Sequence, residues 1–201
     1  MVFITTTRQI SWDCVQVTLS MGSSFFIRTC YLQVLVDHEI VVNRHLSDVE
    51  LEDLIAAGLV FAAEKAAMGY LERAEHSRHL LTVKLKKKGY ADVSIQRALD
   101  YLEERSYLSD LRYAESWLRN RAINHAEGRS KLLSGLLSKG IDGKIANAAL
   151  DNYFHTIDED AVLNMAIEKC LRLGKSQEAM ERYLARKGFS YKQIKSKISN
   201  L

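Results

Sequence analysis

A ten-residue pattern occurs three times in this chain, and it limits the possible folds more than any other feature. It consists of an apolar residue, three variable residues, Leu, two variable residues, Lys-Gly and a large apolar residue. The copies lie at Leu81–Tyr90, Leu132–Ile141 and Met180–Phe189, with their lysines 51 and 48 residues apart. Repetition at this spacing is typical of chains built from tandem structural units.

Each copy has the features of a helix C-terminus. Leu81 and Leu85 are four residues apart and therefore share one helix face. Lys88 in the last turn faces the negative end of the helix dipole, and Gly89 can take the left-handed conformation that ends a helix. We therefore interpret each Lys-Gly pair as a stop signal, with direct binding by the lysine as the alternative.

The residues around the motif predict two further helices in each repeat. Leu99, Leu150 and Ile198 lie ten residues after their glycines and mark a trailing helix in each repeat. The sequence thus predicts a mainly α fold of three tandem three-helix units that form an elongated, curved array. We expect an N-terminal β-hairpin with a capping helix at 1–57, and three-helix units at 58–106, 107–155 and 156–201.

The N-terminal segment differs in pattern from the rest. Residues Cys14–Leu19 alternate apolar and polar, and an apolar run follows at Phe25–Arg28, which together indicate a β-hairpin. The short run Glu39–Asn43 is compatible with another strand. Ser47 and Glu50 form a capping-box signature for a helix, which we expect Gly58 to interrupt.

Composition excludes several classes of protein. The 201 residues include no proline and only three cysteines, so a disulfide framework is not expected and a reduced, cytoplasmic protein is. No uninterrupted apolar run of about 18 residues is present, so we expect no membrane span. The net charge is only +3, but the segment after Glu168 is rich in Lys and Arg, which suits a polyanion or an acidic protein surface.

The sequence contains no recognisable catalytic constellation, so we expect a protein that is not an enzyme and needs no cofactor or metal. His76 and His79 lie three apart without a nearby Cys or acidic ligand, which makes a metal site there a weak hypothesis. Basic side chains on the motif helices are the better candidates for partner binding. These candidates are Arg78, Lys84, Lys86, Lys87, Arg129, Lys131, Arg182 and Arg186. The alternative is an ordinary solvated helix face.

Three segments, in order, resemble the RecX family of regulatory proteins. Arg73–Gly89 resembles the family's R-x-x-S-x-x-E-L-x-x-K-L-x-x-K-G segment, although Leu80 stands in place of Glu. Tyr107–Ala114 is similar to G-Y-L-x-D-x-R-[FY]-A, although Ser106 replaces the Gly. Gly128–Ile141 is similar to G-x-x-x-I-x-x-x-L-x-x-K-G-[IV]. The resemblance extends over about residues 60–201.

The resemblance implies a non-enzymatic, monomeric regulator of the RecA recombinase. RecX proteins bind the RecA–single-stranded DNA filament, lower its ATPase and strand-exchange activity, and limit the co-protease activity that triggers the SOS response. A stand-alone DNA-binding protein built of helix-turn-helix-like units is the alternative, because the C-terminal segment is basic. The two alternatives are compatible, since direct DNA contact could assist docking on a filament.

Overall fold

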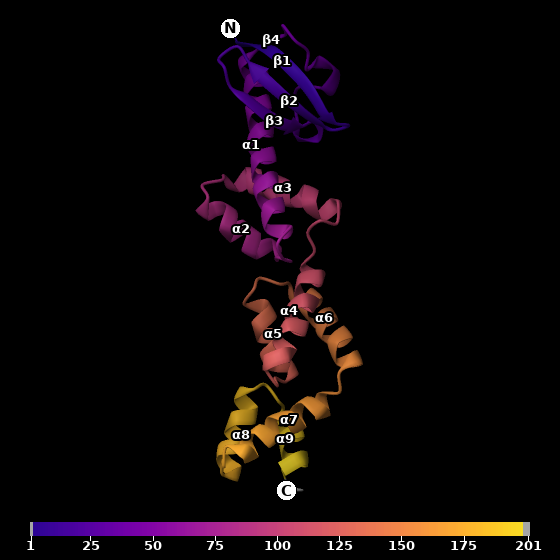
Figure 1. Ribbon diagram of the computed structural model, residues 1–201, viewed down its shortest axis with the longest axis vertical. Coiled ribbons are helices and arrows are strands. Elements are labelled where there is room, and N and C mark those ends of the chain that lie inside the picture. Colours follow the sequence, from indigo (N-terminus) through magenta and orange to yellow (C-terminus); the bar gives the residue numbers. More distant parts are fainter. Residues whose placement is uncertain (1, 199–201) are drawn as a thin grey trace. The chain divides into compact units, whose positions relative to one another are not determined.

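The computed structural model describes residues 2–198. The strands are β1 (Val2–Ser11), β2 (Cys14–Leu19), β3 (Ser24–Arg28) and β4 (His45–Leu46). The helices are α1 (Asp48–Leu71), α2 (Arg78–Lys87), α3 (Asp92–Glu104), α4 (Asp110–Asn124), α5 (Arg129–Leu137), α6 (Gly143–Thr156), α7 (Glu159–Arg172), α8 (Gln177–Arg186) and α9 (Tyr191–Ile198) (Figure 1). The predicted mainly α fold with a small N-terminal β segment is confirmed.

The chain divides into two compact units. The first consists of Met1–Ala74 and Leu81–Leu108, and the second consists of Glu75–Leu80 and Ser109–Leu201. The first unit contains the sheet, α1, α3 and most of α2. The second contains α4–α9 and the first turn of α2, so the contacts of that turn with α4–α6 lie within a single unit.

The sheet has the strand order β3-β2-β1-β4, with every neighbouring pair antiparallel. The predicted hairpin of β2 and β3 is confirmed, with Val15 opposite Ile27. The predicted strand at Glu39–Asn43 is wrong. A turn occupies this stretch instead, with Asn43 at a φ of 67°, and the strand that pairs with β1 begins after it, at β4.

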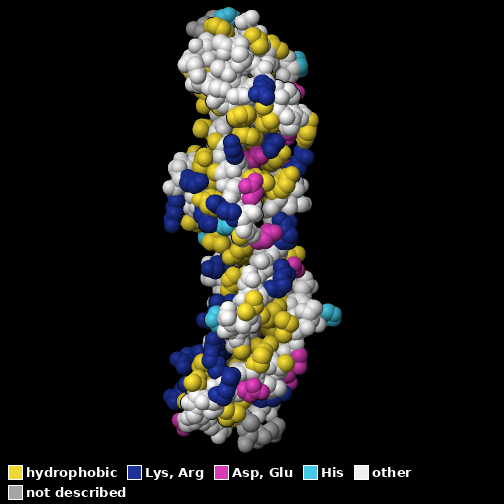
Figure 2. Space-filling model, viewed as in Figure 1, with side chains coloured by type: hydrophobic (Ala, Val, Ile, Leu, Met, Phe, Trp, Pro, Cys, Tyr) yellow, Lys and Arg dark blue, Asp and Glu magenta, His cyan; other side chains and the backbone are white. Residues whose placement is uncertain are grey.

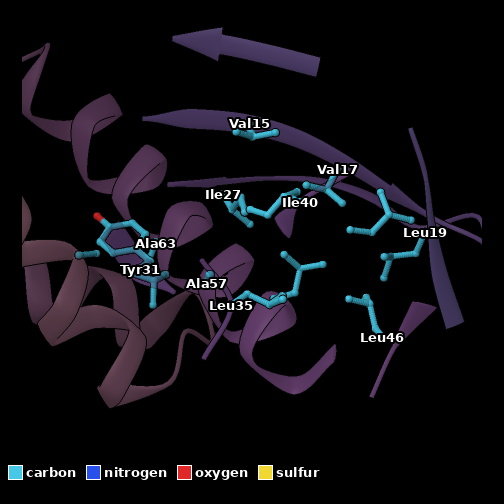
Figure 3. Close-up of a cluster of buried hydrophobic side chains, with 14 residues drawn as sticks. Val15, Val17, Leu19, Ile27, Tyr31, Leu35, Ile40, Leu46, Ala57 and Ala63 are labelled. Atoms are coloured by element: carbon cyan, nitrogen blue, oxygen red, sulfur yellow. The ribbon is translucent and has the colours of Figure 1, made fainter. Parts of the chain in front are cut away.

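The sheet buries one face against α1. Val15, Val17 and Ile27 from the strands point toward Ala57 and Ala63 of the helix (Figure 3). The small alanines let the helix approach the sheet closely, and the larger side chains of the strands fill the remaining volume. This cluster is the hydrophobic core of the β-containing part.

The predicted interruption at Gly58 is wrong, because α1 runs without a break from Asp48 to Leu71. The ring of Phe25 lies against Gly58, where a Cβ atom would stand 2.7 Å from the Phe25 Cδ2 atom. Gly58 therefore provides space for an aromatic ring of β3. The glycine is needed for packing, which the sequence pattern does not distinguish from a helix stop.

Helix α1 is long and apolar enough to span a membrane by length and composition, which the sequence analysis did not anticipate. Its two buried carboxylates indicate a core helix instead. Asp53 accepts hydrogen bonds from the backbone N–H groups of Gln33–Leu35, at 2.9–3.1 Å. Glu64 accepts from the Arg28 side chain at 2.6 and 2.7 Å. These bonds hold α1 to the loops and strands of the first unit.

The repeated motif ends its helix as predicted. Gly89, Gly140 and Gly188 have φ values of 87°, 75° and 89°. After each glycine, the next N–H donates back to the motif leucine, as from Ile141 N to Leu136 O at 3.3 Å. This is the Schellman arrangement of a helix C-terminus. The motif leucines and the trailing-helix residues Leu99 and Leu150 are fully buried.

Candidate partner-binding surface

The three motif helices can be compared position by position because their lysines are 51 and 48 residues apart. Lys87 of α2, Ser138 after α5 and Arg186 of α8 occupy one such position. Lys131 of α5 corresponds to Ala179 of α8. Equivalent faces of the helices therefore carry different side chains, and only some units present basic groups there.

In the first unit, neighbouring side chains engage two of the predicted lysines. The Lys84 ammonium lies 4.5 Å from the centroid of the Tyr70 ring. Lys86 pairs with Asp92 at 2.7 Å, although both side chains are more than half exposed. Lys87 is exposed. Arg78, in the first turn of α2, belongs to the second unit. It is half-buried, and its backbone N–H donates to the Asp110 carboxylate at 2.8 Å.

In the second unit, the structure separates the remaining predicted residues into two groups. Arg129 pairs with Asp151 at 2.6 Å and is partly neutralised. Lys131, Arg182 and Arg186 are exposed, and none of them forms an ion pair with another residue in the 2–198 range. These three, together with the exposed Lys87 of α2, are the predicted residues best placed to meet a partner.

Lys131 belongs to a pocket between α4 and α5, here called the α5 pocket. It is lined by Trp117, Arg121, Lys131, Ser134, Gly135, Ser138 and Lys139. The Trp117 ring lies on Gly135, where a Cβ atom would come within 2.4 Å of the ring. The Arg121 guanidinium lies 5.3 Å from the indole centroid. Arg121 pairs with the buried Glu127 at 2.6 Å, so Lys131 and Lys139 are the cations left in the pocket. With the hydroxyl groups of Ser134 and Ser138, they suit an oxyanion such as a carboxylate or phosphate.

Arg182 and Arg186 belong to a shallow depression on α8, here called the α8 groove. It is lined by Lys175, Ala179, Arg182, Ala185 and Arg186. Figure 2 shows Lys and Arg side chains gathered over the part of the second unit that contains α8. Because the side chains of Ala179 and Ala185 are short, they leave the three cations of the groove accessible to a partner.

A joint links the start of α5 to the Lys-Gly turn of α8. The Gly128 N–H donates to Lys187 O at 2.9 Å, and Ser130 Oγ donates to Gly188 O at 2.8 Å. Buried Glu127 accepts hydrogen bonds from Arg121 at 2.6 and 3.0 Å and meets the Lys187 ammonium at 3.5 Å. The joint holds α7–α9 against α4–α6 and fixes the α5 pocket relative to the α8 groove.

Burial acts to raise the pKa of Glu127, but the hydrogen bonds and charges of Arg121 and Lys187 outweigh it and hold the pKa below its ordinary value. A carboxylate with a lowered pKa in the folded state stabilises the fold above its unfolded pKa. This stabilisation is lost as the pH falls through the lowered value.

We expect Glu127→Gln to lower the free energy of unfolding at pH 7 by about 1–3 kcal/mol, because two cations lose their shared carboxylate. The difference from the parent protein should shrink as the pH falls below the ordinary glutamate pKa of about 4.3 and toward the lowered pKa of Glu127, where the parent carboxylate protonates. Urea unfolding at several pH values measures both effects. Asp151→Asn, which removes an exposed carboxylate, is the control and should change little. Equal unfolding midpoints at pH 7 would contradict the role of Glu127.

Sequence reasoning did not name Arg121 as a candidate, and it included Lys175 only within the basic segment after Glu168. One local signal was available for the first of them. Arg121 follows Trp117 by four residues, so the two side chains share a helix face. Lys175 lies in the turn after α7, and no helical spacing links it to Arg182. Among residues 2–198, no group of three His, Cys, Asp or Glu side chains could hold a metal ion.

Comparison with family models identifies two segments of the chain. Residues 63–102 match the model of the RecX first three-helix domain, and residues 109–150 match the second. The regulatory protein RecX of Treponema pallidum strain Nichols is 34% identical over 130 residues, covering 65% of this chain and 79% of the relative. That of Prosthecochloris aestuarii is 32% identical over 139 residues, covering 67% and 90%.

Solved structures agree with the sequence comparison. A crystal structure of a regulatory protein RecX covers 100% of both chains with a TM-score of 0.77 and 17% identity, a likeness of fold. The crystal structure of RecX from Lactobacillus salivarius has a TM-score of 0.62 and 26% identity, covering 71% of this chain and 96% of that one. With two family domains matched in order and relatives covered over most of their length, this chain belongs to the RecX family of regulatory proteins.

Proposed function

We propose that this protein is a monomeric, cytoplasmic regulator that binds RecA and the RecA–single-stranded DNA filament. It lowers the ATPase, strand-exchange and co-protease activities of RecA, and so moderates DNA repair and the SOS response. It acts by binding and not by catalysis. The observation that carries the proposal is the pair of exposed basic surfaces, the α5 pocket and the α8 groove, in a chain of the RecX family.

Tandem units suit binding to a filament. A single exposed ion pair contributes about 0–1 kcal/mol, so one surface alone gives weak affinity. Two surfaces joined in one chain bind with a high effective concentration for the second contact. If the bound conformation of RecA is an inactive one, binding shifts the subunits toward that state without any chemical step.

We expect the protein to lower the ATPase rate of RecA on single-stranded DNA and to co-sediment with the filament. Arg182→Glu with Arg186→Glu should weaken inhibition about tenfold or more, because reversing charges in the α8 groove opposes the partner's field. Lys144→Glu, on an exposed residue of α6 outside both surfaces, is the matched control for a charge reversal. Absence of both inhibition and filament binding by the parent protein at low-micromolar concentration would overturn the proposal.

Stand-alone DNA binding is a second candidate, favoured by the α5 pocket. Hydroxyl and cationic groups such as Ser134 and Lys131 are common phosphate ligands. This function predicts DNA affinity without RecA that falls steeply as salt is added. Titration of a labelled oligonucleotide at increasing salt tests it, and absent binding near physiological salt would exclude it.

A further inference from the structure

At two places in the second unit, a Lys-Gly turn packs against the start of a motif helix. At α2, Ser77 is fully buried, and its hydroxyl donates to the backbone carbonyl of Lys139 at 2.8 Å. At α5, Gly128 is buried at the equivalent position, and its N–H donates to Lys187 O at 2.9 Å. In both places, the Lys-Gly turn of the following repeat covers the first turn of the helix.

The equivalent position of α8 is uncovered. Ser176 lies 48 residues after Gly128 and is exposed, and its hydroxyl is bonded only within its own helix start, to Ala179 N–H at 3.4 Å. Within residues 2–198, no backbone hydrogen bond from another turn reaches Ser176 or Gln177. The α8 groove begins beside this position, at Ala179, the counterpart of the Lys131 residue that contacts Gly188 in the α5 joint.

The charges at α8 differ from those at the α5 joint. At the α5 joint, the receiving side supplies Glu127, which pairs with Lys187 of the arriving turn. The residue 48 positions later is Lys175, so a Lys-Gly turn would meet a like charge at α8. Glu178 likewise replaces Ser130, whose hydroxyl donates to the carbonyl of the arriving glycine. A third Lys-Gly turn, including one from a second copy of this chain, is therefore a poor occupant.

The groove itself favours an occupant with carboxylates. Lys175, Arg182 and Arg186 line it, and none of its described lining residues is acidic. The Tyr183 ring, also on α8, has the ammonium groups of Lys175 and Lys187 each 5.8 Å from its centroid. Its faces are thus less available for base stacking, which single-stranded nucleic acid sites commonly use.

We propose that the α8 groove, with the uncovered start of α8, is a docking site for an acidic segment of a partner protein. The segment takes the place that a Lys-Gly turn occupies at α5, with Asp or Glu side chains against Lys175, Arg182 and Arg186. This inference rests on the proposed function for the identity of the partner and adds the chemistry of the contact. The α8 groove is thus a protein-binding surface.

The test uses the full chain with two fluorescent probes, a short peptide of alternating glutamate and glycine and an oligothymidylate of equal charge. Fluorescence anisotropy gives the affinity for each. We expect Lys175→Glu with Arg182→Glu to weaken peptide binding about tenfold and oligothymidylate binding much less. Lys144→Glu, on an exposed residue of α6 outside the α8 groove and the α5 pocket, is the matched control and should leave the peptide affinity unchanged.

Loss of oligothymidylate binding with unchanged peptide binding would overturn the inference and make the groove a nucleic-acid site. Failure of the parent protein to bind the peptide would also overturn it. The same variants are then compared in filament co-sedimentation. If the parent protein binds RecA and the Lys175→Glu, Arg182→Glu variant binds it equally well, the inference fails and the proposed function stands. If the peptide binds through the groove but RecA does not bind, the proposed function fails and the inference stands.

Discussion

Replacing Arg28 by alanine is expected to lower the free energy of unfolding of the first unit by about 3–5 kcal/mol, the cost of leaving buried charges unpaired. The Arg28 guanidinium pairs with Asp13 at 2.9 Å and with Glu64 at 2.6 Å. Both carboxylates are nearly inaccessible, at 2% and 3% exposure. Without the guanidinium, two negative charges remain in the interior of the unit.

Tyrosine hydroxyls extend this cluster and cannot replace the cation. Tyr31 donates to Glu64 at 2.8 Å, and Tyr101 donates to Asp13 at 3.1 Å. Burial is the main cause that raises the pKa of Tyr101 to about 12, so its hydroxyl stays protonated at neutral pH. The cluster joins the β1–β2 turn, β3, α1 and α3, so its loss should affect the whole first unit.

Urea unfolding followed by circular dichroism at pH 7 measures the effect of Arg28→Ala. Arg44→Ala is the control, because Arg44 pairs with Glu39 and Glu50 near the surface and its loss should matter little. The penalty should decrease in acid. Burial acts to raise the pKa of Asp13, and in the parent protein the Ser11 hydrogen bond and the Arg28 charge help to hold that pKa below its ordinary value; without the guanidinium, Asp13 takes up a proton more readily. A midpoint equal to that of the parent protein would show that water reaches Asp13 and Glu64.

The helix ends were predictable because they depend on local chemistry. A glycine just after a Lys, followed by a large apolar residue, specifies a left-handed C-terminus from a few adjacent residues. The buried faces followed from four-residue spacing, as for Leu81 with Leu85. The cluster around Arg28 follows no such rule, because residues 13, 28, 64 and 101 meet only in the folded unit. Gly58 was misread for the same reason, since the ring that requires it comes from β3.

Several of the predicted candidate residues have accessible side chains. Lys131, Arg182 and Arg186 are exposed, as a contact role requires. Arg129 and Lys86 were weaker choices because acidic residues of neighbouring helices pair with them, and a helix-by-helix reading does not include those neighbours. The joints went unrecognised because each combines residues about 60 positions apart. In the α5 joint, Gly188 is a capping glycine of the motif, whereas Gly128 precedes α5 and lies outside the motif copies.

Gly128→Ala is expected to weaken the packing of α7–α9 against α4–α6. A Cβ atom at this position would stand 2.5 Å from Gly188 O and 2.8 Å from Phe189 N, and these are backbone atoms that cannot rotate away. The φ of Gly128 is −79°, which alanine adopts readily, so the cost comes from the contact alone. Overpacking of this kind costs about 1–3 kcal/mol.

Hydrogen exchange measures this loss of stability in each helix. We expect reduced protection in α7–α9 and little change in α1 and α3. Gly143→Ala is the matched control, because no atom lies within 4 Å of its Cβ position and alanine favours the helix by about 0.5–1 kcal/mol. Unchanged protection of α7–α9 would mean that the turn of α8 adjusts to the methyl group.

If the joint opens, the α5 pocket and the α8 groove lose their fixed spacing. Inhibition of RecA should then weaken although every basic side chain is still present, because linked contacts add only when both can form at once.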